Sequence, residues 1–216
     1  DCKFCATGKI LRKRNLNADE IYDQVVVMDH QSRLYFDRPL SNIVFMGMGE
    51  PLMNYKNLIN AIDKITQSEG LGMSPSRITV STSGIPKMIM KMADDKVRFG
   101  LAISLHSARQ NVREELMPFA EKFPLKDLAH AIKYWFKKTS KAITYEYVIW
   151  KGINDNDEDI NALVDFCKIS PCKVNLIEYN PIGDDQFLQA EKDRIKAYKI
   201  ALEAKRITVT VRRSSG

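Results

Sequence analysis

Apolar and polar residues along this chain form a pattern typical of strands and helices that follow one another in turn. Short, nearly continuous apolar runs predict strands at residues 42–48, 78–82, 99–105, 142–150, 173–179 and 207–211. Apolar residues at helical spacing predict helices at residues 17–30, 54–67, 86–94, 111–117, 125–139, 156–168 and 191–204. Asn17, with Glu20 three residues later, forms a capping-box pattern at the start of the first helix. The chain therefore alternates between strand and helix over its whole length.

This alternation is typical of β-α-β units, in which parallel strands are joined by crossover helices. Parallel strands covered on both faces carry continuous apolar runs rather than alternating ones, and most of the predicted strands have such runs. The sequence contains no linker, low-complexity segment or additional repeat. We therefore predict an α/β fold with a parallel sheet, in one domain over residues 1–216.

Small and polar residues follow four of the predicted strands. These residues form the segments Gly47–Pro51, Ser81–Gly84, Ser104–Ser107 and Glu178–Pro181. Because the carboxyl ends of parallel strands meet at one edge of a sheet, these segments are expected to lie at the same edge, where α/β folds carry their sites. The sequence therefore predicts a binding site at this edge.

The basic residues of the chain indicate a possible class of binding partner. Lys and Arg number 33 against 27 Asp and Glu, which gives a net charge of +6. The cations gather in three groups: Lys9, Arg12, Lys13 and Arg14; Lys133, Lys137, Lys138 and Lys141; and Lys205, Arg206, Arg212 and Arg213. Such groups favour a polyanion such as nucleic acid, and a solvated surface is the alternative. No apolar run is long enough to predict a membrane span, and we expect no membrane partner.

The cysteines allow several kinds of site. Cys2 and Cys5 form a C-x-x-C pair, which suits a redox couple, a zinc site with two further ligands, or an iron–sulfur loop with a third thiolate upstream. Spacing alone does not choose among these three. Cys167 and Cys172 lie far along the chain at a wider spacing, and we interpret them as ordinary buried thiols.

Two further residues of the predicted edge are candidates for ligand contact. Gly47 and Gly49 resemble part of a dinucleotide-binding fingerprint, but the third glycine is missing, so we do not predict a pyrophosphate site. Glu50 could hold a ligand ammonium group, or it could be a solvated side chain of a glycine-rich turn. His106 ends a strand, which makes it a better candidate than His30 or His130, although a core histidine is the alternative.

Taken in order, these motifs resemble one enzyme family. The segments CKFCATG, GMGEPLMN, STSG, SLHS, YEYV with KGIND after it, YNP and VRRSSG occur in sequence across essentially the whole chain. This order is similar to that of the radical SAM adenine methyltransferases of 23S rRNA, the RlmN and Cfr group. The resemblance implies a partial (β/α)6 barrel that lacks its first strand in this chain.

The resemblance also implies two cofactors, a 4Fe–4S cluster and S-adenosylmethionine (SAM). Cys2 and Cys5 would be two of three thiolate ligands of the cluster, with the first ligand upstream of Asp1. One iron would be left to chelate the amino and carboxylate groups of SAM, and an electron donor would reduce the cluster. The family's SAM contacts fall at Gly49, Glu50, Ser81, Ser104, Leu105, His106 and Asn180.

The implied activity is methylation of an adenine in 23S rRNA at C2, and for some members of an adenine in tRNA, in the cytoplasm. Family members first methylate a cysteine of their own, which here would follow Gly216, while a second, resolving cysteine would precede Asp1. The family's N-terminal accessory domain would also lie outside this chain. We therefore assign no catalytic residue within residues 1–216 and expect the chain alone to be inactive.

Three alternatives stay open at this point. The motifs do not distinguish methylation at C2 from methylation at C8 of the same adenine. Another radical SAM reaction on a different substrate would use the same core. A non-catalytic zinc- or RNA-binding domain would use Cys2 and Cys5 without SAM.

Overall fold

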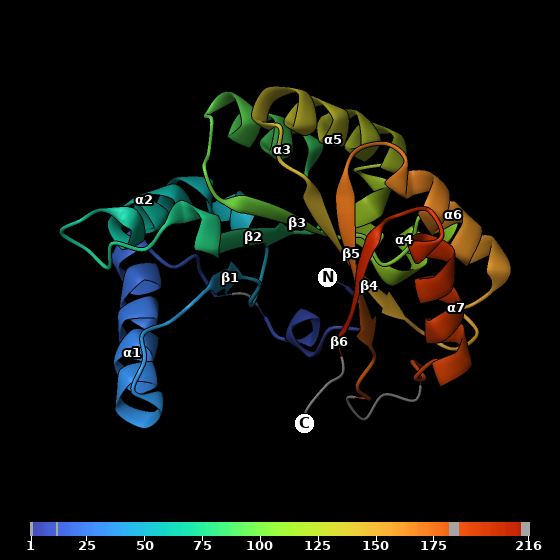
Figure 1. Ribbon diagram of the computed structural model, residues 1–216, viewed down its shortest axis with the longest axis horizontal. Helices are drawn as coiled ribbons and strands as arrows, with labels where there is room; N and C mark the ends of the chain where they lie inside the picture. The colour runs from blue at the N-terminus through green and yellow to red at the C-terminus, as the bar shows by residue number, and fades with distance from the viewer. Residues whose placement is uncertain (1, 12, 182–185, 213–216) are drawn as a thin grey trace. The chain divides into compact units, whose positions relative to one another are not determined.

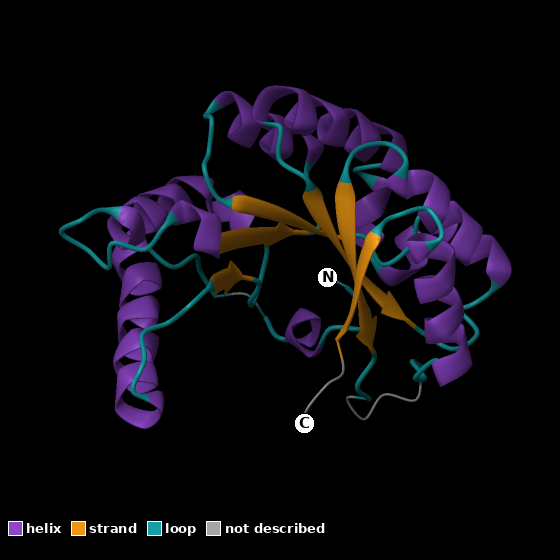
Figure 2. Cartoon of the chain, viewed as in Figure 1, coloured by secondary structure: helices purple, strands orange, loops and turns teal. Residues whose placement is uncertain are grey.

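In the computed structural model, the described residues are 2–11, 13–181 and 186–212, so Arg12 and Arg213 of the basic groups lie outside them. Helices and strands alternate within this part of the chain (Figures 1 and 2). The strands are β1 (Ile43–Phe45), β2 (Ile78–Thr82), β3 (Gly100–Ser104), β4 (Ile143–Ile149), β5 (Cys172–Glu178) and β6 (Thr208–Arg212). The α-helices are α1 (Ala18–Phe36), α2 (Tyr55–Thr66), α3 (Pro86–Asp94), α4 (Gln110–Leu116), α5 (Leu125–Thr139), α6 (Asp157–Cys167) and α7 (Lys192–Glu203).

The sheet follows the order β1-β2-β3-β4-β5-β6, so strands that are consecutive in the sequence are neighbours. The pairs β1·β2, β3·β4, β4·β5 and β5·β6 are parallel. Parallel neighbours need a crossover connection, and the α-helices between the strands supply it. The predicted α/β fold with a parallel sheet is confirmed.

The chain divides into two compact units. Unit 1 contains residues 1–10, 83–97 and 102–216, and unit 2 contains residues 11–82 and 98–101.

In unit 2, α1 begins with the predicted capping box: the Asn17 side chain accepts from the Glu20 N–H, and the Glu20 carboxylate accepts from the Asn17 N–H, both at 2.9 Å. Hydrogen bonds from Arg14 and from the Asn17 backbone lower the pKa of Glu20 to about 2. The charged carboxylate is therefore kept at the positive end of the helix.

The core of unit 1 lies around its parallel strands. Strand β4 is buried along nearly its whole length, and the pair β4·β5 runs in register from Ile143↔Cys172 to Ile149↔Glu178. Helix α5 lies beside α3 (Figure 1), where the Tyr134 hydroxyl donates to Asp94 at 2.5 Å. The inner face of α5 is fully buried, and its Trp135 donates to the Lys141 carbonyl at 3.1 Å. These contacts pack α5 against α3 and against the segment before β4.

Two predicted elements differ from the structure. Helix α1 continues past residue 30 to Phe36, because Arg33 pairs with Asp29 one turn earlier and the helix ends only at Asp37, which adopts a left-handed φ of 51°. Strand β1 covers Ile43–Phe45 rather than residues 42–48, because the Met46 N–H turns back to the Val44 carbonyl and ends the pairing. Among the described residues, no helix is long and apolar enough to cross a membrane.

Candidate functional site

In unit 2, the candidate residues follow the ends of β1 and β2. Glu50 caps a short 3-10 helix, η2 (Pro51–Asn54), and its Oε1 accepts from the Leu52 N–H at 3.0 Å and from the Thr82 hydroxyl at 2.8 Å. Gly49 adopts a φ of 96°, a conformation that side chains disfavour. Ser81 is buried in β2, directly before Thr82. The structure thus brings Glu50 to the end of β2 and fixes the direction of its carboxylate.

In unit 1, Ser104 ends β3, and Leu105 and His106 follow it directly. The Leu105 N–H donates to the Glu146 carbonyl of β4 at 3.0 Å. His106 is buried, and its Nδ1 accepts from the Val148 N–H at 3.2 Å. Burial, with a smaller effect of Arg113, lowers the pKa of His106 to about 3. The imidazole is therefore neutral at physiological pH, with its proton on Nε2.

The ends of β3 and β4 are joined by Asn154, which sequence analysis did not single out as a site residue. Its side-chain amide donates to the His106 carbonyl at 2.6 Å and to the Val148 carbonyl at 2.8 Å, and its Oδ1 accepts from the Trp150 N–H at 2.7 Å. The Tyr198 hydroxyl donates to the Asn154 carbonyl at 2.6 Å. Asn154 belongs to the KGIND segment, so this motif is the sequence signal that could have identified it as a site residue.

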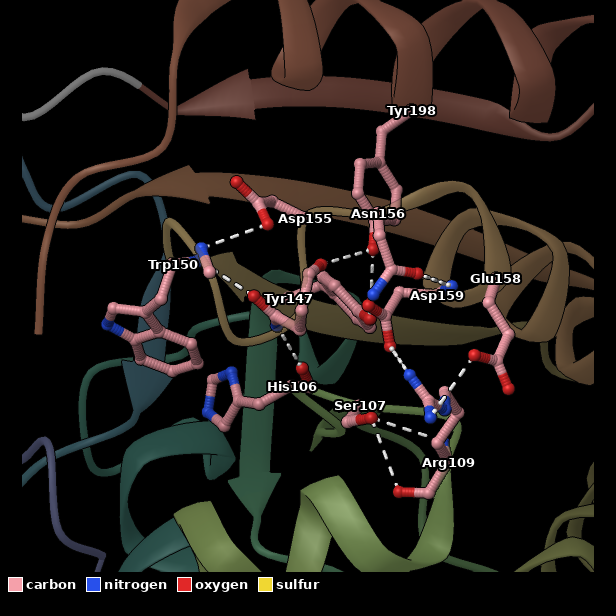
Figure 3. Close-up of polar contacts among 12 residues, drawn as sticks. His106, Ser107, Arg109, Tyr147, Trp150, Asp155, Asn156, Glu158, Asp159 and Tyr198 are labelled. Carbon is pink, nitrogen blue, oxygen red and sulfur yellow. Dashed lines mark hydrogen bonds and ion pairs between the residues drawn. The ribbon is translucent and has the colours of Figure 1, made fainter.

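A second polar group supports the same strand end. Ser107 accepts from the Arg109 N–H at 3.1 Å, and the Arg109 guanidinium pairs with Asp159 at 3.2 Å and with Glu158 at 3.3 Å (Figure 3). Asp159 lies in the first turn of α6, next to the capping residue Asn156. These contacts tie the loop after β3 to the start of α6. No local pattern in the sequence marks these contacts, because Arg109 and Asp159 are 50 positions apart.

Cys2 and Cys5 lie on a tight loop at the start of unit 1. The Cys5 N–H donates to the Cys2 carbonyl at 3.2 Å, and the Gly8 N–H donates to the Cys5 carbonyl at 3.0 Å. A Cβ atom on Gly8 would lie 2.8 Å from the Cys2 carbonyl oxygen, so the loop excludes a side chain there. Both cysteines are half-buried, and none of the four cysteines forms a disulfide. Cys167 is buried as predicted, whereas Cys172 is only half-buried.

The loop is anchored to the rest of unit 1 between its two cysteines. The Lys3 N–H donates to the Leu116 carbonyl at the end of α4, at 3.0 Å. The Phe4 ring contacts the rings of His106 and Trp150, with centroids 4.9 and 4.7 Å away. The structure therefore brings Cys2 and Cys5 close to the candidate residue His106.

The surroundings of Cys2 suit a thiolate ligand of a cluster. Arg113 of α4 is fully buried, its Nε donates to the Leu105 carbonyl at 3.2 Å, and its Nη2 donates to the Ser83 carbonyl at 2.6 Å. Its Nη1 has no hydrogen-bond partner among the described residues. Burial lowers the pKa of Arg113 to about 10, and Cys2 is the charge that opposes this shift. A buried cation near Cys2 favours the anionic thiolate that iron requires.

Asn180 follows β5 and is exposed. The residue before it, Tyr179, is buried, and its ring packs against Trp150 with centroids 5.9 Å apart. Asn180 therefore lies at the same end of the unit 1 strands as His106. Among the described residues, no three Cys, His, Asp or Glu side chains come together as a complete metal site.

Comparisons with known proteins agree with this arrangement. Residues 1–167 match the model of the radical SAM superfamily. The whole chain is 66% identical to a protein of Christiangramia forsetii named "Probable dual-specificity RNA methyltransferase RlmN" and 65% identical to one of the same name from Flavobacterium psychrophilum. The chain spans 61% and 62% of the lengths of these two relatives.

Solved structures give the same result for the fold. A radical SAM methyltransferase from Sphaerobacter thermophilus matches all of this chain with a TM-score of 0.95 and 37% identity, and the match covers 63% of that protein. Streptococcus suis SuiB bound to S-adenosylmethionine matches 99% of this chain and 47% of its own chain, with a TM-score of 0.69 at 15% identity. At this identity the second match shows the shared fold alone.

Proposed function

This chain belongs to the radical SAM superfamily and is RlmN-like over its whole length, and from this we propose that it is the SAM-binding core of an enzyme that methylates adenine in RNA. The observation that carries the proposal is the 66% identity over all 216 residues to a protein named as a dual-specificity RNA methyltransferase. The loop of Cys2 and Cys5 beside the end of β3 supports it independently.

Cys2 and Cys5 would supply two thiolates to a 4Fe–4S cluster, with a third from outside this chain. Bound together, the cluster and SAM supply one-electron, radical chemistry, and a separate electron donor would reduce the cluster. Two thiols on one short loop, with the buried guanidinium of Arg113 near Cys2, fit an iron–sulfur centre, because a nearby cation stabilises the thiolate form that iron requires.

The remaining candidate residues would bind SAM. The Glu50 carboxylate, held in direction by Leu52 and Thr82, would accept a hydrogen bond from the SAM ammonium. The bare backbone of Gly49 would allow close approach of the ligand. Ser81, Ser104, Leu105 and Asn180 would supply further contacts from their strand ends. His106 is neutral and therefore would not repel the positive sulfonium of SAM.

We propose that the substrate is an adenine of 23S rRNA, methylated at C2 through a methylcysteine that lies outside residues 1–216. The dual-specificity name of the relatives extends this proposal to tRNA. The net charge of +6 suits a polyanionic substrate, and a cytoplasmic location follows from the ribosomal target. Because the methyl-carrying and resolving cysteines lie outside it, we propose that this chain alone does not methylate RNA.

Nucleoside analysis of the RNA product tests this proposal. The chain, extended on both sides to include these cysteines, would be incubated with reductant, SAM and 23S rRNA without oxygen. Mass spectrometry of the digested RNA is expected to find 2-methyladenosine, and the same protein with Cys5→Ser is the control. Exclusive 8-methyladenosine would overturn the C2 assignment, and an unmodified RNA would overturn the methyltransferase assignment.

A further inference from the structure

Unit 1 contains a pocket at the amino ends of its strands, opposite the ends that carry His106 and Asn180. Its volume is about 580 Å³, within the range of pockets that take small ligands. The lining comes from α5, from the segment before β5 and from the segment before β6. It consists of Lys133, Phe136, Lys137, Cys167, Lys168, Ile169, Ser170, Pro171, Cys172, Arg206 and Ile207.

The lining is strongly cationic. Four of these residues are Lys or Arg, and none of the described lining residues is a carboxylate. Lys168 pairs with Asp165 at 2.6 Å, but Lys133, Lys137 and Arg206 form no ion pair within the described part of the chain. Lys133 and Lys137 are one turn apart on α5, a spacing at which like charges destabilise a helix. Two basic groups that are far apart in the sequence thus converge on one pocket that lacks a counter-charge.

Arg206 occupies the position after α7 where glycine is the usual residue. It follows α7 with a φ of 60°, and its N–H donates to the Glu203 carbonyl at 2.8 Å. This left-handed position after a helix is usually occupied by glycine, because other side chains are strained there. Asp37 and Ser140 also adopt this conformation after helices, but Arg206 is the one of these three that lines the pocket.

Ser170 supplies a neutral donor in the same pocket. The residue is 6% exposed, and its Oγ has no hydrogen-bond partner among the described residues. A buried hydroxyl without a partner destabilises a fold, so such a group requires an explanation. A bound anion would accept a hydrogen bond from it.

We propose that this pocket binds a phosphate group, and that the phosphate belongs to the backbone of the RNA substrate. Three unpaired cations and a buried hydroxyl donor match the charge and the acceptor oxygens of a phosphate. The choice of RNA as its source rests on the proposed function, whereas the phosphate site itself rests on the pocket alone. RNA would then contact this chain at a second place, away from the strand ends that carry the candidate SAM residues of unit 1.

RNA affinity at several salt concentrations tests the proposal. The variant K133Q/K137Q/R206Q would be compared with K87Q/K126Q/K196Q, which removes the same charge from exposed lysines outside the pocket. Each lost phosphate contact reduces the slope of log K against log salt by about 1, so we expect the pocket variant, which loses one phosphate contact, to lower the slope by about 1 and the affinity about tenfold near 0.1 M salt. An equal loss in both variants would overturn the proposal.

A second arm separates the possible sources of the phosphate. We expect inorganic phosphate to bind the parent chain, and Ser170→Ala to weaken that binding without lowering the free energy of unfolding. If phosphate binds in the pocket but the RNA slope is unchanged in K133Q/K137Q/R206Q, a small phosphate ligand replaces RNA and the assignment to RNA is overturned. The extended chain could also bind RNA through the pocket and yet form no methyladenosine. That result would overturn the proposed function and would support the phosphate site in the pocket.

Discussion

Phe4 packs edge-on against the His106 ring, with the ring centroids 4.9 Å apart and the ring planes at 77°. Phe4 lies between the two cysteines of the N-terminal loop, and His106 follows the end of β3. The contact therefore joins the segment expected to hold the cluster to the strand end expected to hold SAM.

Phe4→Ala is expected to loosen the cysteine loop without unfolding the chain. An aromatic pair contributes about 1 kcal/mol beyond the area it buries, so local opening should increase roughly fivefold. The rate at which a maleimide reagent modifies Cys2 and Cys5 measures this opening. Phe136→Ala, a half-buried ring at the opposite ends of the strands, is the matched control and should leave that rate unchanged. Equal rates in the parent and in Phe4→Ala would contradict the anchoring role.

His106 makes the stability of the fold depend on pH. Because its pKa falls to about 3 in the folded chain from 6.5, the unfolded chain binds a proton first as the pH decreases. The contribution of the neutral His106 to the free energy of unfolding is fully present above pH 6.5, and it is lost progressively as the pH falls toward 3. Between pH 7 and pH 5 the expected loss is about 2 kcal/mol of unfolding free energy.

Urea unfolding at the two pH values measures this loss. Other titrating groups contribute equally to the parent and to His106→Gln, so the difference between the two proteins isolates the histidine. The variant should lose about 2 kcal/mol less than the parent, and the exposed His130→Gln should behave like the parent. A His106→Gln variant with the parent's pH dependence would show that the imidazole does not resist protonation in the fold.

Asn154→Ala is expected to be among the more destabilising single changes. It removes three buried hydrogen bonds and leaves the carbonyls of His106 and Val148 without their donor, at a cost of about 3 kcal/mol. Asn154→Asp should be no less costly, because a carboxylate donates to neither carbonyl. Chemical denaturation measures both, with the exposed Asn161→Ala as control. A cost near that of the control would contradict the bridging role of Asn154.

Local features of this chain could be predicted from the sequence, and long-range ones could not. The capping box of Asn17 and Glu20 was predicted because both partners lie within one helical turn. The end of α1 was misplaced because it depends on the left-handed Asp37 and on the Asp29–Arg33 pair rather than on periodicity. The order of strands and helices was recovered because the apolar runs of the central strands, such as β3 and β4, are buried along most of their length.

The candidate site shows the same division. Gly49, Glu50 and His106 were found because they follow strand ends, a position that the apolar runs alone define. Thr82 as the partner of Glu50, and Arg113 near Cys2, depend on contacts between distant segments and carry no local pattern. The SAM contacts themselves come from the order of the motifs, not from periodicity.

Glu50 offers a test of SAM binding that leaves the fold intact. In Glu50→Gln the amide oxygen can still accept from Leu52 and Thr82, so only the negative charge is lost. We expect the dissociation constant for SAM to rise by about tenfold or more, as for loss of a charge-assisted hydrogen bond. Calorimetric titration measures it, and Glu69→Gln, another residue of unit 2, is the control. Unchanged affinity in Glu50→Gln would remove this residue from the site.

Reductive cleavage of SAM measures whether this chain is the core of a radical SAM enzyme. The chain, extended upstream to include the third expected cysteine, would be supplied with iron and sulfide without oxygen and then reduced in the presence of SAM. We expect a brown protein with about four irons per chain that forms 5′-deoxyadenosine, and we expect Cys2→Ser to lose both properties. A protein that binds zinc at Cys2 and Cys5, takes up no iron–sulfur cluster and leaves SAM intact would contradict it.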